Sequence, residues 1–116
     1  MKIIKFRVWD KKNKVMASWK FIKEFYDFNE LDNNKTFLQF TGLKDKKGKE
    51  IYEGDIIKIT NNDLFDEPLK IIWYEPIARF GMQELNSYCC WDFNPKRMRE
   101  MKVMGNIYEN KELLKE

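Results

Sequence analysis

The sequence predicts a mainly β protein: a small barrel-like antiparallel sheet of short strands, with a short helical segment and a C-terminal helical turn. Two patterns predict this fold. Apolar and polar residues mostly alternate, which is typical of half-buried strands, and runs of Asp, Asn, Gly and Pro interrupt the alternation at short intervals, as in small barrels. The 116 residues fit one domain over 1–116, and a composition with 43% hydrophobic and 16% aromatic residues can fill its core.

The N-terminal part of the chain is expected to hold a hairpin and a short helical turn. Alternation around Phe6 and Val8 predicts the first strand, the polar residues 10–14 predict a turn, and residues 15–17 predict the returning strand. Aromatic side chains recur at helical spacing in residues 18–31, although so many aromatics suit a strand equally, and we expect irregular structure or a short helical turn there. Two charged side chains should form the outward half of the first strand: Lys5 and Arg7.

The rest of the sequence predicts further strands separated by turns. The turn before Glu50 includes Gly48, which can take a positive φ. Gly105 with Asn106 indicates a bulge or a pair of residues with positive φ near the end of the last strand, and Asn110 can cap the C-terminal helical turn. Residues 50–52 lead into a second tight turn at 53–55. The expected strands cover residues 36–41, 56–60, 69–74, one or two segments within 77–93, and 98–107.

The lack of histidine excludes several kinds of active site. With a His count of 0, the chain cannot hold a Ser-His or Cys-His nucleophile pair, a histidine metal ligand or an imidazole acid–base. The sequence has no glycine-rich phosphate loop, and its two cysteines cannot alone supply the four ligands of a usual zinc site. We therefore expect no enzymatic activity, no metal and no cofactor.

Charge is distributed unevenly along the chain. Residues 1–50 carry 13 Lys or Arg against 7 Asp or Glu, whereas residues 51–116 carry 9 against 12. A lysine-rich solvated surface is the simpler explanation of this bias, and an anionic partner is the alternative. Because charges interrupt the N-terminal apolar run and no apolar stretch could span a membrane, we expect a cytoplasmic protein with reduced cysteines.

Three blocks of the sequence together resemble a known family. They are Phe6–Asp10, Gln39–Ile56 and Met104–Asn110. Their order and spacing resemble the YopX family of small proteins from phages and prophages of Gram-positive bacteria. The resemblance implies a phage-encoded protein of the host bacterial cytoplasm, is compatible with self-association, and brings no catalytic motif. The residues that carry it are Trp9, Asp10, Thr41, Gly42, Asp45, Gly48, Tyr52, Gly54, Asp55, Gly105, Asn106 and Tyr108.

A structural role is the simpler interpretation of these motif residues. Their glycines lie where the chain leaves or enters a strand, so a side chain there would risk a clash. Asp45 and Asp55 can accept hydrogen bonds from backbone N–H groups of the following turn. The aromatic members, Trp9, Tyr52 and Tyr108, would pack in the core or at its rim.

Two other groups of residues have both a reactive and an inert interpretation. Glu50, Glu53 and Asp55 could act as acid and base or hold a magnesium ion, but the flanking lysines favour a solvated turn. Cys89 and Cys90 could offer a redox thiol, but no positive charge adjoins them in the sequence. We therefore expect one buried and one half-exposed thiol.

Basic and aromatic residues interleave near the N-terminus. Single-stranded nucleic acids are bound by aromatic side chains that stack on the bases and by cations that contact the phosphates. Because a small β domain must bury most of its aromatic residues, nucleic-acid binding is the second hypothesis rather than the first. The candidate residues are Lys5, Arg7, Trp9, Lys11, Lys12, Lys14, Trp19 and Lys20.

Self-assembly is the leading functional hypothesis. Alternate side chains of a strand face outward, so one inward face cannot cover all the bulky apolar residues of this chain. Such a surplus predicts a homo-oligomer, with a dimer as the default and a larger ring, which the family resemblance allows, as the alternative. We expect a non-enzymatic accessory protein that acts through self-assembly or an unidentified protein partner, with nucleic-acid binding or sequestration of a small anionic ligand as alternatives. The surplus residues are Trp19, Phe21, Phe25, Tyr26, Phe28, Met98, Met101 and Met104.

Overall fold

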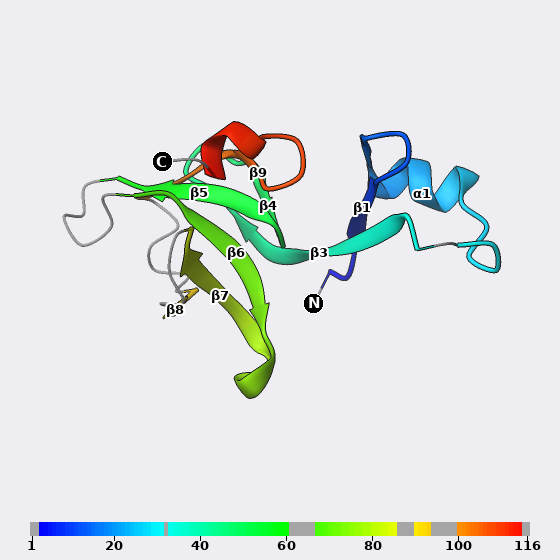
Figure 1. Cartoon of the computed structure of the whole chain (residues 1–116). Helices are drawn as coiled ribbons and strands as arrows, with labels where there is room; N and C mark the ends of the chain where they lie inside the picture. The colour runs from blue at the N-terminus through cyan, green and yellow to red at the C-terminus, as the bar shows by residue number, and fades with distance from the viewer. Residues whose placement is uncertain (1–2, 32, 61–66, 86–89, 94–99, 115–116) are drawn as a thin grey trace.

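The strands of the computed structural model form two antiparallel sheets, which confirms the mainly β prediction (Figure 1). The structure describes residues 3–31, 33–60, 67–85, 90–93 and 100–114. Helical structure includes α1 (Trp19–Phe25) and two short 3-10 turns, η1 (Glu75–Ile77) and η3 (Lys111–Leu114). The last of these is the predicted C-terminal helical turn. No helix in these ranges is both long enough and apolar enough to cross a membrane.

Both sheets follow the predicted strands closely. The first has the order β2-β1-β3-β4 and consists of β1 (Phe6–Asp10), β2 (Val15–Ala17), β3 (Lys35–Lys44) and β4 (Glu50–Tyr52). The second has the order β8-β7-β6-β5-β9 and consists of β5 (Asp55–Ile59), β6 (Leu69–Tyr74), β7 (Arg79–Glu84), β8 (Cys90–Asp92) and β9 (Met101–Asn106). The last strand begins later than expected, and residues 94–99 before it lie outside the described ranges.

A tight hairpin and a short helix form the N-terminal part of the fold. Asp10 ends β1, and its carboxylate accepts hydrogen bonds from the backbone N–H groups of Lys12 and Asn13, both at 3.1 Å. The helix α1 begins after Ser18, whose hydroxyl accepts a hydrogen bond from the first turn at 3.3 Å. The helical interpretation of this segment is therefore correct for α1.

The long strand β3 joins the two halves of the molecule. The first half contains β1, β2 and α1, and the second half contains β4 and the second sheet. Its first five residues pair with β1, and Phe40 and Lys44 pair with β4, with a register shift between them. At this irregularity the hydroxyl of Thr41 donates to the carbonyl oxygen of Ile51 at 2.7 Å. Such a break in register bends a strand, and Figure 1 shows β3 curving from the α1 side of the molecule toward β5 and β6.

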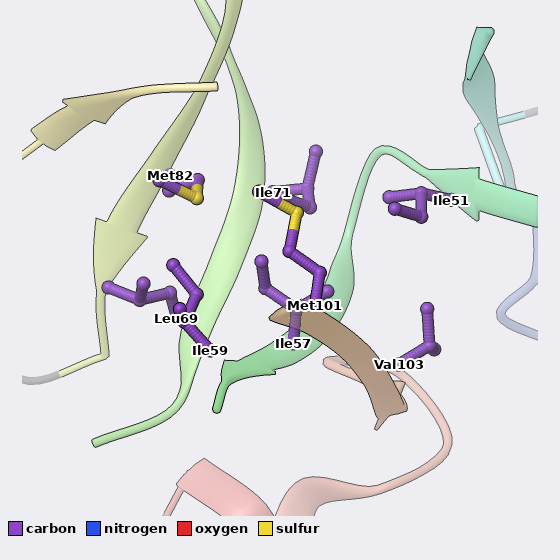
Figure 2. Packing of buried hydrophobic residues seen from close by; sticks show 8 residues of the cluster. All are labelled: Ile51, Ile57, Ile59, Leu69, Ile71, Met82, Met101 and Val103. Carbon is purple, nitrogen blue, oxygen red and sulfur yellow. The ribbon is translucent and has the colours of Figure 1, made fainter. Parts of the chain in front are cut away.

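Buried apolar side chains gather in two clusters, one in each half. The cluster of the second half contains Ile51, Ile57, Ile59, Leu69, Ile71, Met82, Met101 and Val103. Figure 2 shows these eight side chains with Met101 near the centre, so this residue belongs to the core and not to an exposed surplus. The smaller cluster contains Val8, Ala17 and Ile22, against which Trp19, Tyr26 and Phe37 pack.

The face of β1 that points away from α1 is covered by the second half of the molecule. Val8 is fully buried on the α1 side, whereas its neighbours Arg7 and Trp9 contact β5 and the segment after β9. The expectation that Arg7 lies on a solvent-facing half is therefore wrong, because its side chain is only 14% exposed. β1 therefore buries Val8 under α1 and half-buries Arg7 and Trp9 against β5 and the segment after β9.

Gly54 lies where the chain passes from β4 in the first sheet to β5 in the second. Its φ of +87° is a conformation that favours glycine. Its N–H donates to the carbonyl oxygen of Ile71 at 2.8 Å, and its own carbonyl accepts from the N–H of Ile107 at 2.9 Å. A Cβ here would lie 3.0 Å from Cε2 of Tyr108. The crossing therefore needs glycine both for its backbone and for its packing.

Replacing Gly54 by alanine should destabilise the protein more than the same change at Gly48. Gly48 has a similar φ of +84°, but a Cβ there meets open space. We expect Gly48→Ala to lower the free energy of unfolding by about 1 kcal/mol through its backbone alone. Gly54→Ala should lose at least about 1 kcal/mol more, because the Tyr108 ring must move. Urea unfolding measures both variants, and equal losses would contradict the close packing at Gly54.

Candidate functional site

Asp45 is one of several motif residues that meet at the junction between the two sheets. Its carboxylate accepts hydrogen bonds from the N–H groups of Lys47 at 2.8 Å and Lys49 at 2.9 Å, within its own turn. A third comes from the N–H of Val103 in β9, at 2.9 Å. Burial by itself raises the pKa of Asp45, but these three donors outweigh it and hold the pKa below its ordinary value. Asp45 therefore closes the β3–β4 turn and ties it to β9.

Asp55 and Arg7 form an ion pair between β5 and β1. Asp55 is 1% exposed; one carboxylate oxygen binds Nη2 of Arg7, and the other accepts from the N–H of Tyr52 at 2.7 Å. The guanidinium also lies over the Tyr52 ring, 4.7 Å from its centroid. Burial raises the pKa of Asp55, whereas Arg7 and the Tyr52 N–H favour its charged form. The pair holds the hairpin against the second sheet.

The segment after β9 folds into a compact turn that positions Tyr108. Asn106 accepts hydrogen bonds at its Oδ1 from the N–H groups two and three residues ahead, at 3.0 and 2.8 Å, and its own N–H donates to Oδ1 of Asn110. A Cβ at Gly105 would collide with the Asn110 side chain. The β5–β9 register shifts beside Gly105, as the predicted bulge requires. The Tyr108 ring stacks on Trp9, with centroids 5.7 Å apart and an interplanar angle of 29°.

An open groove, called here the Trp9–Tyr108 groove, runs beside the stacked rings and has a volume of about 870 Å³. Its lysines come from the β1–β2 turn and from η3, and their side chains are exposed. The groove therefore joins part of the basic and aromatic set of the N-terminal segment to the C-terminal motif. It is lined by Trp9, Lys11, Lys14, Thr36, Tyr108, Glu109, Lys111 and Glu112.

The remaining basic and aromatic candidates lie away from this groove. Arg7 is held in its buried ion pair, and Lys5 pairs with Glu50 between β1 and β4. Trp19 packs against the smaller apolar cluster. Two further candidates are exposed outside the groove: Lys12 and Lys20. Of the eight residues, the groove brings together Trp9, Lys11 and Lys14.

The acidic residues around the β4–β5 crossing do not form a solvated turn, so that expectation is wrong. Asp55 is buried, Glu50 pairs with Lys5, and Glu53 accepts a hydrogen bond from the N–H of Gln39 at 3.4 Å. Each carboxylate is directed at its own partner. Within the ranges that the structure describes, no three potential metal ligands gather.

The cysteine pair falls partly outside the described structure. Cys90 begins β8, where its side chain is exposed. Cys89 lies outside the described residues, as does Met98 of the bulky set. The structure therefore shows one accessible thiol and leaves the expected buried one undescribed.

A second, more apolar hollow lies between the hairpin and α1, with a volume of about 490 Å³. Beside it, the Phe21 and Phe25 rings contact each other with centroids 4.7 Å apart. Phe21 and Phe25 are 48% and 66% exposed, so this side of the molecule carries part of the aromatic surplus, whereas Phe28 packs against Phe37. The hollow is lined by Asp10, Asn13, Val15, Met16, Ala17, Ser18, Phe21, Tyr26 and Lys35.

Comparisons with known proteins place the chain in a family. The family model described as YopX protein matches residues 21–115. The chain belongs to the YopX family. It is also similar to a solved structure, the crystal structure of protein EF1440 from Enterococcus faecalis, at 27% identity and a TM-score of 0.72. The similarity covers 99% of this chain and 100% of that one, and no curated protein matches.

The YopX match includes the junction but begins inside α1. Asp45, Asp55 and Tyr108 lie within the matched range, whereas Arg7 and Trp9, which contact two of them, precede it. The similarity to the solved structure extends over nearly the whole chain and so includes the hairpin. The junction of this YopX-family chain is therefore built partly from residues outside the match.

Two residues that contribute to these surfaces, Lys35 and Lys111, were not among the candidates that the sequence predicted. Lys35 faces Asp10 at 3.0 Å, and the two residues are directly opposite each other in the β1–β3 register. Opposite charges at the facing ends of two predicted strands were the available signal for this pair. Lys111 reaches the groove because the Asn106 turn brings η3 back toward β1. Nothing in the local sequence shows that approach.

The stability of the protein should depend on pH through Asp10. Hydrogen bonds from the side-chain amide and then the N–H of Asn13, helped by Lys35, lower the pKa of Asp10 from 3.8 to about 2. Because the folded pKa lies below the unfolded one, Asp10 stabilises the fold at neutral pH, and this contribution is lost as the pH falls through the folded pKa. Asp10→Asn should therefore be less stable than the parent at pH 7.

Unfolding curves recorded between neutral pH and pH 2 test this expectation. The difference between Asp10→Asn and the parent should shrink as the pH approaches the folded pKa. Asn13→Ala is the control, because it keeps the carboxylate and removes its strongest donor. A stability difference between Asp10→Asn and the parent that stays constant down to pH 2 would contradict the role of the charge.

Proposed function

We propose that this YopX-family chain acts without catalysis, as an accessory protein of a phage or prophage that pairs with a second copy of itself in the host cytoplasm. The observation that carries the proposal is one exposed surface, called here the α1 aromatic face. It consists of Val15, Phe21 and Phe25: Val15 and Phe21 line the same hollow, and the Phe21 and Phe25 rings are in contact. The family membership supports the phage origin, and the surface supports the mode of action.

The α1 aromatic face leaves large apolar side chains in water. Its members are 53%, 48% and 66% exposed in chain order. Burying a side chain of this size contributes about 1.5–3 kcal/mol relative to leaving it exposed. Contiguous apolar patches on protein surfaces commonly mark sites of association. A partner that covers these rings therefore gains binding free energy.

Protruding rings and a hollow adjoin each other on this side of the molecule. In a two-fold interface the same surface of each copy meets the other, so a patch that carries both shapes can complement itself. Phe25 protrudes beside the hollow that Phe21 and Tyr26 line. This arrangement supports a second copy as the occupant of the hollow.

The surroundings of the α1 aromatic face also suit an interface. The edge strand β2 has β1 as its single strand neighbour among the described residues, which leaves backbone groups available for hydrogen bonds. Lys20, Lys23 and Glu24 are exposed on α1 and would provide a polar rim. Trp19 and Tyr26 pack within the monomer instead, so the proposal rests on fewer bulky residues than the sequence alone suggested.

Light scattering coupled to size exclusion tests the proposal. We expect a dimer of the 14.2 kDa chain in the micromolar range. The double variant Phe21→Ser with Phe25→Ser should raise the dimer dissociation constant at least about tenfold, as the loss of central aromatic contacts does in other interfaces. Ile77→Ser is the matched control, because Ile77 is 50% exposed in the β6–β7 connection.

Two results would overturn the proposal. The first is a parent protein that remains monomeric throughout the micromolar range. The second is a dimer that Ile77→Ser weakens as much as the double variant, since this would remove the α1 aromatic face from the interface. Unfolding curves of all variants establish that each one is folded.

A further inference from the structure

Trp9 and Tyr108 form an aromatic part of the lining of the Trp9–Tyr108 groove, called here its floor, and the fold holds both rings in place. The two rings stack on each other, and both line the groove. Trp9 is fixed because β1 pairs with β3 opposite Thr36, and Tyr108 is fixed by the Asn106 turn and by its close approach to Gly54. Stacking of one nucleic-acid base on an aromatic side chain contributes about 1–3 kcal/mol, and every base has a flat face that can use it.

Lysines reach this floor from two distant parts of the chain. Lys11 and Lys14 belong to the β1–β2 turn, and Lys111 begins η3. All three are exposed, and none of them forms an ion pair with another residue that the structure describes. Lysine side chains in this state are available to neutralise phosphates.

The two glutamates of the groove favour one orientation of an anionic ligand. Glu109 accepts a hydrogen bond from Nδ2 of Asn106 at 2.9 Å, and Glu112 accepts one from Nδ2 of Asn110 at 3.3 Å. Both carboxylates are therefore tied to the C-terminal turn, where Lys111 offsets part of their charge. The β1–β2 turn, with Lys11 and Lys14, is the side on which a phosphate avoids repulsion.

We propose that the Trp9–Tyr108 groove binds single-stranded nucleic acid, with a base on the aromatic floor and its phosphates at Lys11 and Lys14. The same chemistry, an aromatic base that carries phosphate, also occurs in free nucleotides. A strand fits the open groove better, because sites for small free ligands usually enclose most of the ligand surface. Trp9 reaches the groove from the face of β1 opposite Val8 and α1, so the site differs from the α1 aromatic face.

Fluorescence anisotropy with a labelled oligothymidylate of about eight nucleotides tests the proposal, since single-strand sites span about 4–16 nucleotides. We expect Lys11→Gln with Lys14→Gln to weaken binding at least about tenfold at low salt, as for two lost phosphate contacts. Each lost contact should also flatten the slope of log affinity against log salt by about 0.7. Lys12→Gln with Lys20→Gln is the matched control, with the same charge change outside the groove.

Two further measurements test the stacking of a base on the aromatic floor and the source of the ligand. Trp9→Leu should weaken oligonucleotide binding without changing the salt slope, because it removes stacking and no cation. Competition with thymidine monophosphate separates the two sources: displacement that depends on Lys11 and Lys14 assigns the groove to free nucleotides, and its failure assigns the groove to a strand. Absence of binding of both ligands at low salt would overturn the proposal, as would equal weakening by the control pair.

Discussion

The buried ion pair between Arg7 and Asp55 is the contact on which the arrangement of the two halves depends. It joins β1 to β5 where the chain has just crossed from one sheet to the other at Gly54. Asp55 cannot be solvated there, and its second oxygen is already bound by the N–H of Tyr52. A buried charge that loses its partner costs about 3–5 kcal/mol, a large part of the 5–15 kcal/mol that stabilises a typical domain. The hairpin is therefore fixed against the second sheet.

Both candidate surfaces follow from this placement of β1. Val8 on one face packs with α1, which leaves the aromatic side of the helix toward solvent. Trp9 on the other face meets Tyr108, and this contact forms the floor of the groove. One strand thus separates an apolar surface suited to a second copy from a basic and aromatic surface suited to a nucleic acid.

The sequence predicted the strands well because alternation and turn residues are local signals. Helical spacing also indicated α1, and Gly48 takes the positive φ that its turn requires. Alternation shows which residues share a face but not what covers that face, so Arg7 was expected in solvent. The third donor to Asp45 lies 58 residues away, and the Trp9–Tyr108 stack joins opposite ends of the chain. Contacts of this kind depend on the packing of whole sheets, which no local pattern encodes.

A double-mutant cycle in urea tests the role of the ion pair most directly. Arg7→Met and Asp55→Asn should each lower the free energy of unfolding by about 3–5 kcal/mol. The double variant should lose much less than the sum, with a coupling of at least about 2 kcal/mol between the two sites. The more exposed Lys5–Glu50 pair between β1 and β4 is the control, with an expected coupling below about 1 kcal/mol. Losses at Arg7 and Asp55 that add to within about 0.5 kcal/mol would contradict the account.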